Sequence, residues 1–119
     1  MTSPGHVVLF RFPQADQQRG KLRPALVLTR LPSDYPDWLV CMISSQLRHE
    51  VPDLDEIIRP DEPDFESSGL RMESLIRVTR LAVVEEDALL GSIGKVAPTR
   101  LHGIRDRLAA WLSPHPENR

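Results

Sequence analysis

Cysteine is almost absent from this 119-residue chain, and long apolar stretches are missing. The single cysteine, Cys41, excludes an internal disulfide framework, and its apolar neighbours predict a small buried hydrophobe rather than a reactive thiol. No stretch approaches the ~20 apolar residues of a membrane span. The first ten residues also lack the apolar core of a signal peptide. We therefore expect a cytoplasmic protein in a reducing compartment, without membrane association.

Motifs for phosphate loops and metal sites are lacking as well. The sequence has no glycine-rich phosphate loop, and its four histidines are scattered. Several carboxylates fall between residues 53 and 64, where two prolines interrupt them, and this spacing favours a solvated acidic loop over a divalent-metal site. We expect no metal and no cofactor.

The chain also lacks the net positive charge of a general nucleic-acid coat, since its net charge is −2. The distribution is uneven. Residues 1–50 carry six Lys or Arg and four Asp or Glu, residues 51–68 carry one and seven, and residues 69–119 carry eight and six. One acidic segment thus masks a mildly basic remainder, and a local basic groove is compatible with this pattern.

Length and periodicity predict one mostly β domain over residues 1–119, large enough for a core without disulfides or metal. Short apolar or alternating runs are separated by proline and polar residues, as in a sheet of short strands. The expected strands are residues 5–12, 23–29, 38–43, 74–84 and 92–96, with a short edge strand within 53–58 and a helical turn within 85–90.

A C-terminal helix is predicted from Pro98 onward, because proline fits the first turn of a helix. Apolar residues three or four apart then form one stripe, which consists of Leu101, Ile104, Leu108, Trp111 and Leu112. We expect this stripe to pack on the sheet, with Trp111 in the core. Two later prolines end the helix, so residues 113–119 are expected to form a flexible tail.

The segment 21–28 (KLRPALVL) carries the first candidate for chemistry. Pro24 fixes its own φ and favours extended geometry at Arg23, and the apolar run after it is typical of a buried strand. Arg23 is thus expected at the mouth of a rigid strand, where its five donors suit a phosphate group. The alternative is that Arg23 caps the strand end and pairs with a surface carboxylate.

Two polar segments adjoin the predicted strands. Residues 44–46 (SSQ) follow a strand, where their hydroxyl and amide groups either cap the ladder or hydrogen-bond a ligand, and capping is favoured from these residues alone. Residues 14–20 (QADQQRG) form either a solvated hairpin tip or a binding loop.

Four segments, in order, resemble the MazF/PemK toxin family. Residues 5–28 resemble its opening, which includes a Lys-x-Arg-Pro-Ala/Val-Leu-Val strand. Residues 43–46 (ISSQ) resemble its Ile-Thr-Ser/Ala-Gln motif. Residues 68–78 resemble its segment Gly-Leu followed by Ser-Val-Val-Arg-Val-Asp, and residues 93–96 with the helix resemble its ending. The match covers nearly the whole chain.

The resemblance implies a small SH3-like or CcdB-like β-barrel with a C-terminal helix, forming a homodimer. It implies the toxin of a toxin–antitoxin system, which cleaves single-stranded mRNA at selected sequences without a metal. It also implies a cognate antitoxin peptide that occupies the RNA groove. The reaction is attack of a ribose 2′-hydroxyl on the adjacent phosphate, and it requires proton transfer and donors for the phosphate charge.

The resemblance also assigns roles to residues. Arg23 matches the family's catalytic arginine, Ser44 its threonine, and Arg77 an arginine that some members use near the scissile phosphate. The other residues expected to bind RNA are Asp16, Arg19, Lys21, Ser45, Gln46 and Thr79. Thr79 stands where many relatives carry an aspartate, which one branch uses as general base. A second function therefore stays open, a catalytically weak module of this fold that binds RNA or a protein target, as CcdB toxins do.

Overall fold

The computed structural model describes residues 2–11 and 22–113. The strands in these ranges are β1 (His6–Arg11), β2 (Leu22–Arg30), β3 (Asp37–Ser44), β4 (Glu56–Ile58), β5 (Ser74–Glu85) and β6 (Ser92–Lys95). The helices are α1 (Phe65–Ser68) and α2 (Pro98–Leu112), with the short 3-10 turns η1 (Leu47–His49) and η2 (Glu86–Ala88). The predicted strands and the C-terminal helix are present, whereas the sequence pattern does not predict α1 or η1.

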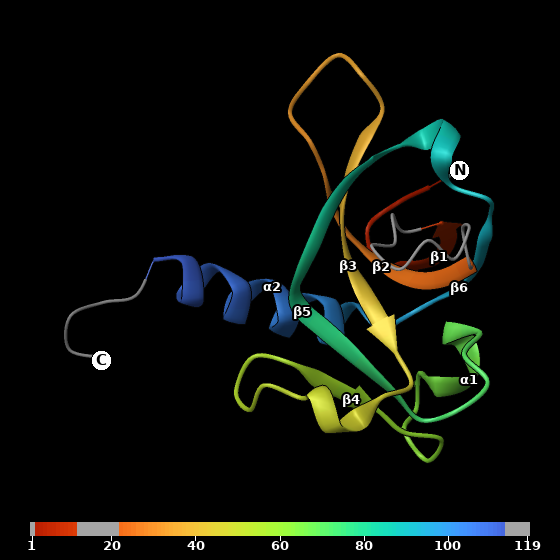
Figure 1. The fold of residues 1–119 in the computed structure, drawn as a ribbon, viewed down its shortest axis with the longest axis vertical. Coiled ribbons are helices and arrows are strands. Elements are labelled where there is room, and N and C mark those ends of the chain that lie inside the picture. Colours follow the sequence, from red (N-terminus) through yellow and green to blue (C-terminus); the bar gives the residue numbers. More distant parts are fainter. Residues whose placement is uncertain (1, 12–21, 114–119) are drawn as a thin grey trace.

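The strands form one antiparallel sheet in the order β4-β5-β3-β2-β1-β6. The nearly continuous apolar sequence of β3 predicts a central position, and β3 indeed lies between β5 and β2. The sheet curls into a half-barrel (Figure 1), and within the described residues its edge strands β4 and β6 do not pair with each other. The prediction of a mostly β, barrel-like fold with a C-terminal helix is confirmed.

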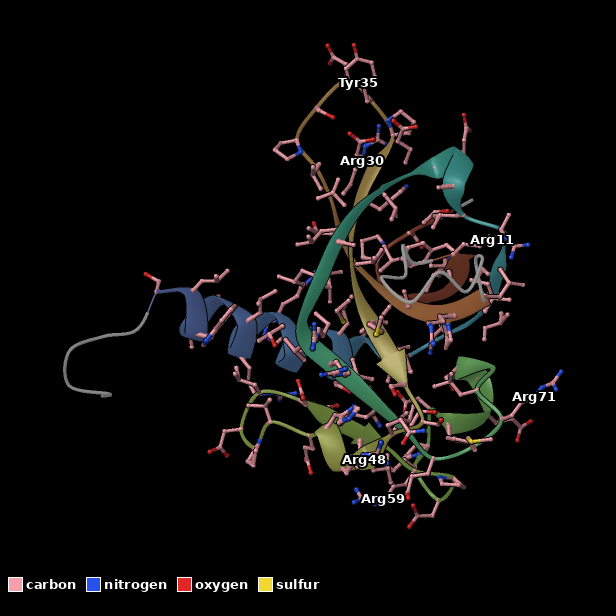
Figure 2. All side chains as sticks on the ribbon, in the orientation of Figure 1. Arg11, Arg30, Tyr35, Arg48, Arg59 and Arg71 are labelled. Carbon is pink, nitrogen blue, oxygen red and sulfur yellow. The ribbon has the colours of Figure 1, made fainter. Side chains whose placement is uncertain are left out.

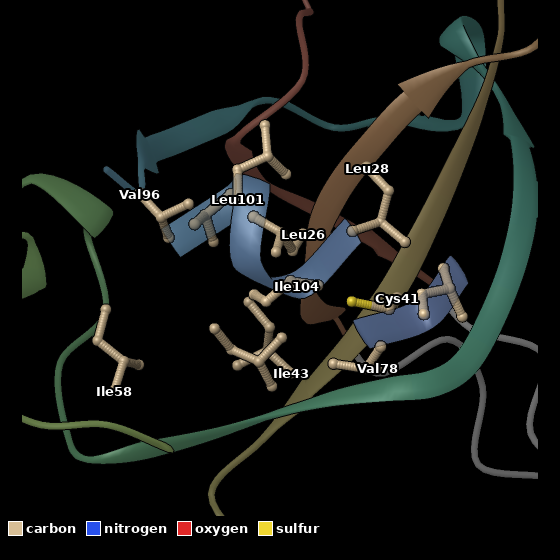
Figure 3. Packing of buried hydrophobic residues seen from close by; sticks show 12 residues of the cluster. Leu26, Leu28, Cys41, Ile43, Ile58, Val78, Val96, Leu101 and Ile104 are labelled. Atoms are coloured by element: carbon tan, nitrogen blue, oxygen red, sulfur yellow. The ribbon is translucent and has the colours of Figure 1, made fainter. Parts of the chain in front are cut away.

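Helix α2 covers one face of this sheet. Its residues Leu101, Ile104 and Leu108 are buried and join a cluster that includes Leu26 of β2 (Figure 3). Burying one large aliphatic side chain contributes ~1.5–3 kcal/mol, so this cluster holds the helix on the sheet. Cys41 lies in the same cluster, where burial raises the pKa of its thiol to about 12. Cys41 is therefore an inert core residue, as its apolar neighbours predict.

A second, smaller cluster lies on the opposite face of the sheet, around Phe10, Val27 and Trp38. Trp38 Nε1 donates a hydrogen bond to Glu86 at 2.8 Å, and the Thr2 hydroxyl donates to the same carboxylate at 2.6 Å. The bond from Thr2 and that from Trp38 hold the pKa of Glu86 below its ordinary value. These bonds tie η2 to the start of the chain and to β3.

The end of helix α2 differs from the sequence-based expectation. Trp111 is 47% exposed and Leu112 is 65% exposed, so the apolar stripe is buried only as far as Leu108. The last turn of α2 extends past the strands (Figure 1). The placement of Trp111 in the core is therefore wrong, because a stripe shows which side of a helix is apolar but not how far the sheet reaches beneath it.

The acidic segment is a solvated loop only in part, which corrects a second expectation. The Arg100 guanidinium on α2 donates to Asp64 from Nε at 2.8 Å and from Nη2 at 2.9 Å. It also donates to Glu56 at 2.6 Å and to Glu62 at 2.9 Å. Hydrogen bonds from Arg100 hold the pKa of the buried Asp64 carboxyl below its ordinary value. We call Arg100, Asp64, Glu56 and Glu62 the Arg100 cluster.

No helix in the described ranges is long and apolar enough to cross a membrane. The assignment of residues 1–119 to a single domain stays a prediction. Residues 114–119 of the expected tail lie outside the described part of the chain.

Candidate functional site

Arg23 is the second residue of β2, opposite Phe10 of β1. The ladder with β3 begins at Ala25, so Pro24, which lacks an N–H, lies just outside that ladder. The Arg23 side chain is half-buried, and its buried Nε atom has no hydrogen-bond partner among the described residues. No described carboxylate pairs with it either. A buried donor without an acceptor is costly, so Arg23 can bind an anionic ligand at little further cost.

Ser44 is the last residue of β3, and its hydroxyl oxygen accepts a hydrogen bond from the backbone N–H of Gln46 at 3.0 Å. The predicted capping of the strand end is thus confirmed. A hydroxyl also carries a proton and a second lone pair, so Ser44 keeps the capacity to bond a ligand while it caps the strand. Ser45 and Gln46 are exposed beside it.

The strand register places the three predicted catalytic residues on one face of the sheet. Ala25 pairs with Met42, and Met42 pairs with Arg77. Ala25, Met42 and Arg77 are therefore neighbours on the same face of the sheet. Side chains two residues apart on a strand share a face, so Arg23 lies on the face of Ala25 and Ser44 on the face of Met42. Both lie toward the same end of the antiparallel pair. This is the face opposite the one that α2 covers.

A cavity of about 810 Å³ lies at this end of β2 and β3. Its lining comes from strand ends, from the loop after α1 and from one residue of β6. The described lining residues are Leu9, Leu22, Arg23, Pro24, Ile43, Ser44, Ser45, Gln46, Gly69, Leu70, Arg71, Met72, Ser74 and Ile93. Four of the predicted site residues, Arg23, Ser44, Ser45 and Gln46, thus line one cavity.

The described lining of the cavity carries net positive charge. Its described lining contains two arginines, Arg23 and Arg71, and no carboxylate. The nearest acidic residue in sequence, Glu73, instead pairs with Arg59 at 3.2 Å. Three serine hydroxyls and one glutamine amide supply neutral hydrogen-bonding groups. This combination suits an anion that also presents hydrogen-bonding edges.

Other predicted site residues lie outside the described lining. Arg77 shares the face of Arg23 but does not line the cavity. In the pairing of β3 with β5, Met42 is opposite Arg77 and the preceding residue, Cys41, is opposite Leu81. Residues 78–80 of β5 therefore have no partner in β3 and form a bulge. Thr79 lies in this bulge, and its side chain is half-buried. The roles of Arg77 and Thr79 stay predictions. So do those of Asp16, Arg19 and Lys21, which lie outside the described residues.

Asp55 is a buried residue that the sequence pattern did not indicate. Its Oδ1 accepts a hydrogen bond from the backbone N–H of Val78 at 2.9 Å, and its Oδ2 accepts from that of Val51 at 2.8 Å. Val78 lies between Arg77 and Thr79, so Asp55 fixes the start of the bulge, which follows Arg77 and carries Thr79. A lone aspartate in an acidic segment gives no sequence signal for such a role.

The loop of Leu70, Arg71 and Met72 was also missed as part of the site. Its sequence shows only one charged and two apolar residues after a glycine, and their position at a cavity depends on the fold. Within the described ranges, no group of three or more His, Cys, Asp or Glu side chains has the arrangement of a metal site. The clustered carboxylates of the acidic segment bind Arg100 instead.

The family model for PemK-like, MazF-like toxins of type II toxin–antitoxin systems matches residues 3–112. A comparison with curated proteins finds no match. Among solved structures, the Mycobacterium tuberculosis toxin MazF-mt6 is 16% identical with a TM-score of 0.65, covering 90% of this chain and 95% of that chain.

Two complexes are also similar to this chain. An endoribonuclease bound to its cognate antitoxin, from a mycobacterial species, is 17% identical with a TM-score of 0.68 over 98% of this chain and 100% of that one. A MazE–MazF structure from Deinococcus radiodurans is 18% identical with a TM-score of 0.68 over 96% and 97%. These structures share the fold, and the family model spans nearly the whole sequence. The chain therefore belongs to the PemK-like, MazF-like toxins of type II toxin–antitoxin systems.

Proposed function

We propose that this toxin is an endoribonuclease that cleaves single-stranded mRNA at selected sequences without a metal ion. The observation that carries the proposal is the cavity that Arg23 and Ser44 both line. The buried Nε of Arg23 has no partner among the described residues, and the described lining contains no carboxylate. A negatively charged phosphodiester complements the positive charge of the described lining, and residues of both β2 and β3 can contact it. Family membership supports the same activity.

In the proposed reaction, the ribose 2′-oxygen forms a bond to the adjacent phosphorus while the bond from phosphorus to the 5′-oxygen breaks. The products are a 2′,3′-cyclic phosphate and a 5′-hydroxyl. Arg23 stabilises the charge that develops on the phosphate oxygens, and Ser44 orients the reacting group. Arg77 lies on the same face of the sheet as Arg23, outside the described cavity lining, and its role near the scissile phosphate stays what the family resemblance implies. Solvent accepts the 2′-hydroxyl proton and supplies a proton to the leaving 5′-oxygen, because no described residue of the cavity lining is a carboxylate or an imidazole.

The decisive experiment incubates the protein with a long single-stranded RNA in EDTA and maps the fragment ends. We expect discrete cuts that bear 2′,3′-cyclic phosphate, and we expect no cuts in the same sequence as a duplex. RNA that stays intact at high protein concentration would contradict the proposal. Loss of cutting only in EDTA would contradict its metal-independent chemistry.

Thr79 provides a second test, because it stands where many relatives carry an aspartate. The variant Thr79→Asp places a carboxylate beside Arg77, and general base catalysis is typically worth ~10²–10⁴-fold. Thr79 lies outside the described cavity lining, so we expect only partial rescue, about tenfold in cleavage rate. Single-turnover cleavage of one RNA measures it. A rate no higher than that of the unmodified protein would show that a carboxylate at residue 79 does not act as a base in this toxin.

We also propose that the chain acts as one domain in a cytoplasmic homodimer that a cognate antitoxin peptide inhibits by occupying the RNA groove. The exposed side chains of Val83, Trp111 and Leu112 offer apolar area for association. Sedimentation equilibrium at micromolar concentration should give twice the chain mass of 13.5 kDa. A species of 13.5 kDa alone would overturn the dimer.

A further inference from the structure

The loop after α1 forms a wall of the cavity that carries its second cation. Arg71 and Met72 line the cavity from this loop, whereas Arg23 and Ser44 come from β2 and β3. The Arg71 side chain is exposed and extends away from the ribbon (Figure 2), so its guanidinium lies in solvent at the rim of the cavity, where it can contact the part of a ligand that continues out of the cavity.

The start of this loop, at the end of α1, is fixed by close backbone packing against β6. Gly69 ends α1 with a left-handed φ of 78°, and a Cβ on it would lie 2.1 Å from the carbonyl oxygen of Ile93. A Cβ on Gly94 would lie 2.2 Å from the carbonyl oxygen of Ser67. Only glycine fits at both positions, so α1 and β6 pack backbone to backbone. The Ser67 hydroxyl also donates to the carbonyl oxygen of Lys95 at 3.1 Å. The loop therefore starts from a fixed point at the cavity.

The acidic residue nearest to Arg71 in the sequence pairs with a different arginine. Glu73 is the acidic residue of this loop, and it pairs with Arg59 at 3.2 Å. No described residue forms a hydrogen bond or ion pair with the Arg71 guanidinium. A cation without a partner among the described residues, at the rim of a cavity without described carboxylates, attracts a polyanion.

Apolar side chains lie beside this cation. Met72 is 57% exposed, Leu22 is 43% exposed and Ile93 is 37% exposed, and all three line the same cavity. A charged group next to exposed apolar area matches a nucleotide, whose phosphate is anionic and whose base has a flat, weakly polar face.

We propose that Arg71 binds a backbone phosphate next to the scissile one and that Met72 contacts the adjoining base, so that this loop sets the affinity of the toxin for RNA. The proposal rests on the proposed endoribonuclease function and adds a subsite to it. Arg71 is a binding residue here and takes no part in bond cleavage.

The test compares Arg71→Ala with Arg30→Ala. Arg30 is also an exposed arginine, but it lies over the Trp38 ring at 5.8 Å and far from Arg71 (Figure 2), so its loss removes the same charge elsewhere. Cleavage kinetics give kcat and KM, and fluorescence anisotropy gives Kd for an RNA oligonucleotide with 2′-deoxyribose at the cleavage site. Both are measured from 50 to 200 mM salt, and circular dichroism checks folding.

We expect Arg71→Ala to raise KM and Kd about tenfold at low salt, with kcat within about twofold of the unmodified protein. The slope of log affinity against log salt should become shallower by about 0.7, the value of one phosphate contact on a single strand. Arg71→Lys should keep the slope, because it keeps the charge. Met72→Ala should weaken binding without changing the slope, and Met72→Leu should restore it.

The results separate this inference from the proposed function. If the unmodified toxin cleaves RNA and Arg71→Ala behaves like Arg30→Ala, the assignment of Arg71 is overturned while the endoribonuclease stands. If the toxin binds RNA without cleaving it, the endoribonuclease falls and the change in slope still decides the role of Arg71. If the toxin neither binds nor cleaves RNA, both fall.

Discussion

Arg23 and Arg100 are both partly buried arginines, but the fold uses them in opposite ways. Arg100 reaches three carboxylates with bonds of 2.6 to 2.9 Å, so its charge is balanced within the protein. Arg23 has a buried Nε without a described partner, in a cavity whose described lining has no carboxylate. The first arginine stabilises the fold, and the second has no acceptor for its Nε among the described residues and can offer this donor to a ligand.

The comparison shows why the arrangement of the acidic segment matters if the toxin binds RNA as we propose. The carboxylates of Glu56, Glu62 and Asp64 would repel a nucleic acid if they faced the cavity. They are instead gathered around Arg100, while Arg107 of α2 also pairs with Glu56. The sequence thus separates a structural ion network from a cationic site within one small fold.

Removing Arg100 should give the largest change. In Arg100→Ala, Asp64 would remain buried without its partner, and breaking a buried ion pair typically costs ~3–5 kcal/mol in the free energy of unfolding. Urea denaturation measures this loss. The matched control is Arg59→Ala, whose exposed pair with Glu73 should be worth only ~0.2–1 kcal/mol. Equal losses in the two variants would show that the Arg100 cluster has no special structural role.

Removing Arg23 should affect the reaction and not the fold. Loss of one donor to a developing charge typically lowers the rate by ~10²–10³-fold, and we expect this for Arg23→Ala. Arg23→Lys should also fail, because an ammonium does not replace the planar fork. Cleavage rates and urea denaturation are measured on the same samples. Near-normal cleavage by Arg23→Ala would show that this cavity is not the active site.

Neutralising Asp64 should produce an effect that depends on pH. The pKa of Asp64 is held low by the hydrogen bonds from Arg100, so its ionised form stabilises the fold above the ordinary pKa of an aspartate. This stability is lost as the pH falls from about 4 through the lowered pKa of the folded state. We expect Asp64→Asn to be less stable than the unmodified protein by about 2 kcal/mol at pH 7, because hydrogen bonds to an ionised group are lost.

The difference between the two proteins should shrink as the pH falls below about 4 and through the lowered pKa of Asp64, because the carboxyl of the unmodified protein then also becomes neutral. Thermal unfolding from pH 2 to 7 measures both curves. A gap that stays constant over this range would show that the charge of Asp64 does not contribute.

Ser44 should give the smallest change. Ser44→Ala removes a hydroxyl hydrogen bond, typically worth ~0.5–1.5 kcal/mol, so we expect about a tenfold slower cleavage. Ser44→Thr should keep most activity because the hydroxyl remains. Single-turnover rates on one RNA compare the two variants. Full activity in Ser44→Ala would mean that the hydroxyl only caps the end of β3 through Gln46.

The sequence predicts the strands well because their apolar runs are short, continuous and separated by proline and polar residues. Residues 23–29 were expected and Leu22–Arg30 is observed, and β3 has the central place that its composition indicates. The local sequence indicates Arg23 and Ser44 as candidates, and the resemblance to the toxin family assigns their roles. The register of β2 and β3 then places both residues on one face of the sheet.

The missed features depend on contacts between distant parts of the chain. Helix α1 has only four residues near two prolines, and its packing against β6 requires the glycine at residue 94. Arg100 gathers the carboxylates of the acidic segment into an ion network, and it lies 36 residues away from Asp64 in the sequence. The position of Arg71 at the cavity follows from the same packing, so no local pattern indicates it.

The buried thiol of Cys41 makes the protein its own reporter of unfolding. Thiol reagents attack the thiolate, and a pKa of about 12 together with complete burial suppresses that form in the folded chain. Alkylation therefore proceeds only through molecules that have transiently opened, and its rate measures their population. Since this is the single cysteine, one mass shift per chain records the opening without any engineered label. A variant that loses cleavage with an unchanged alkylation rate has lost chemistry and not structure.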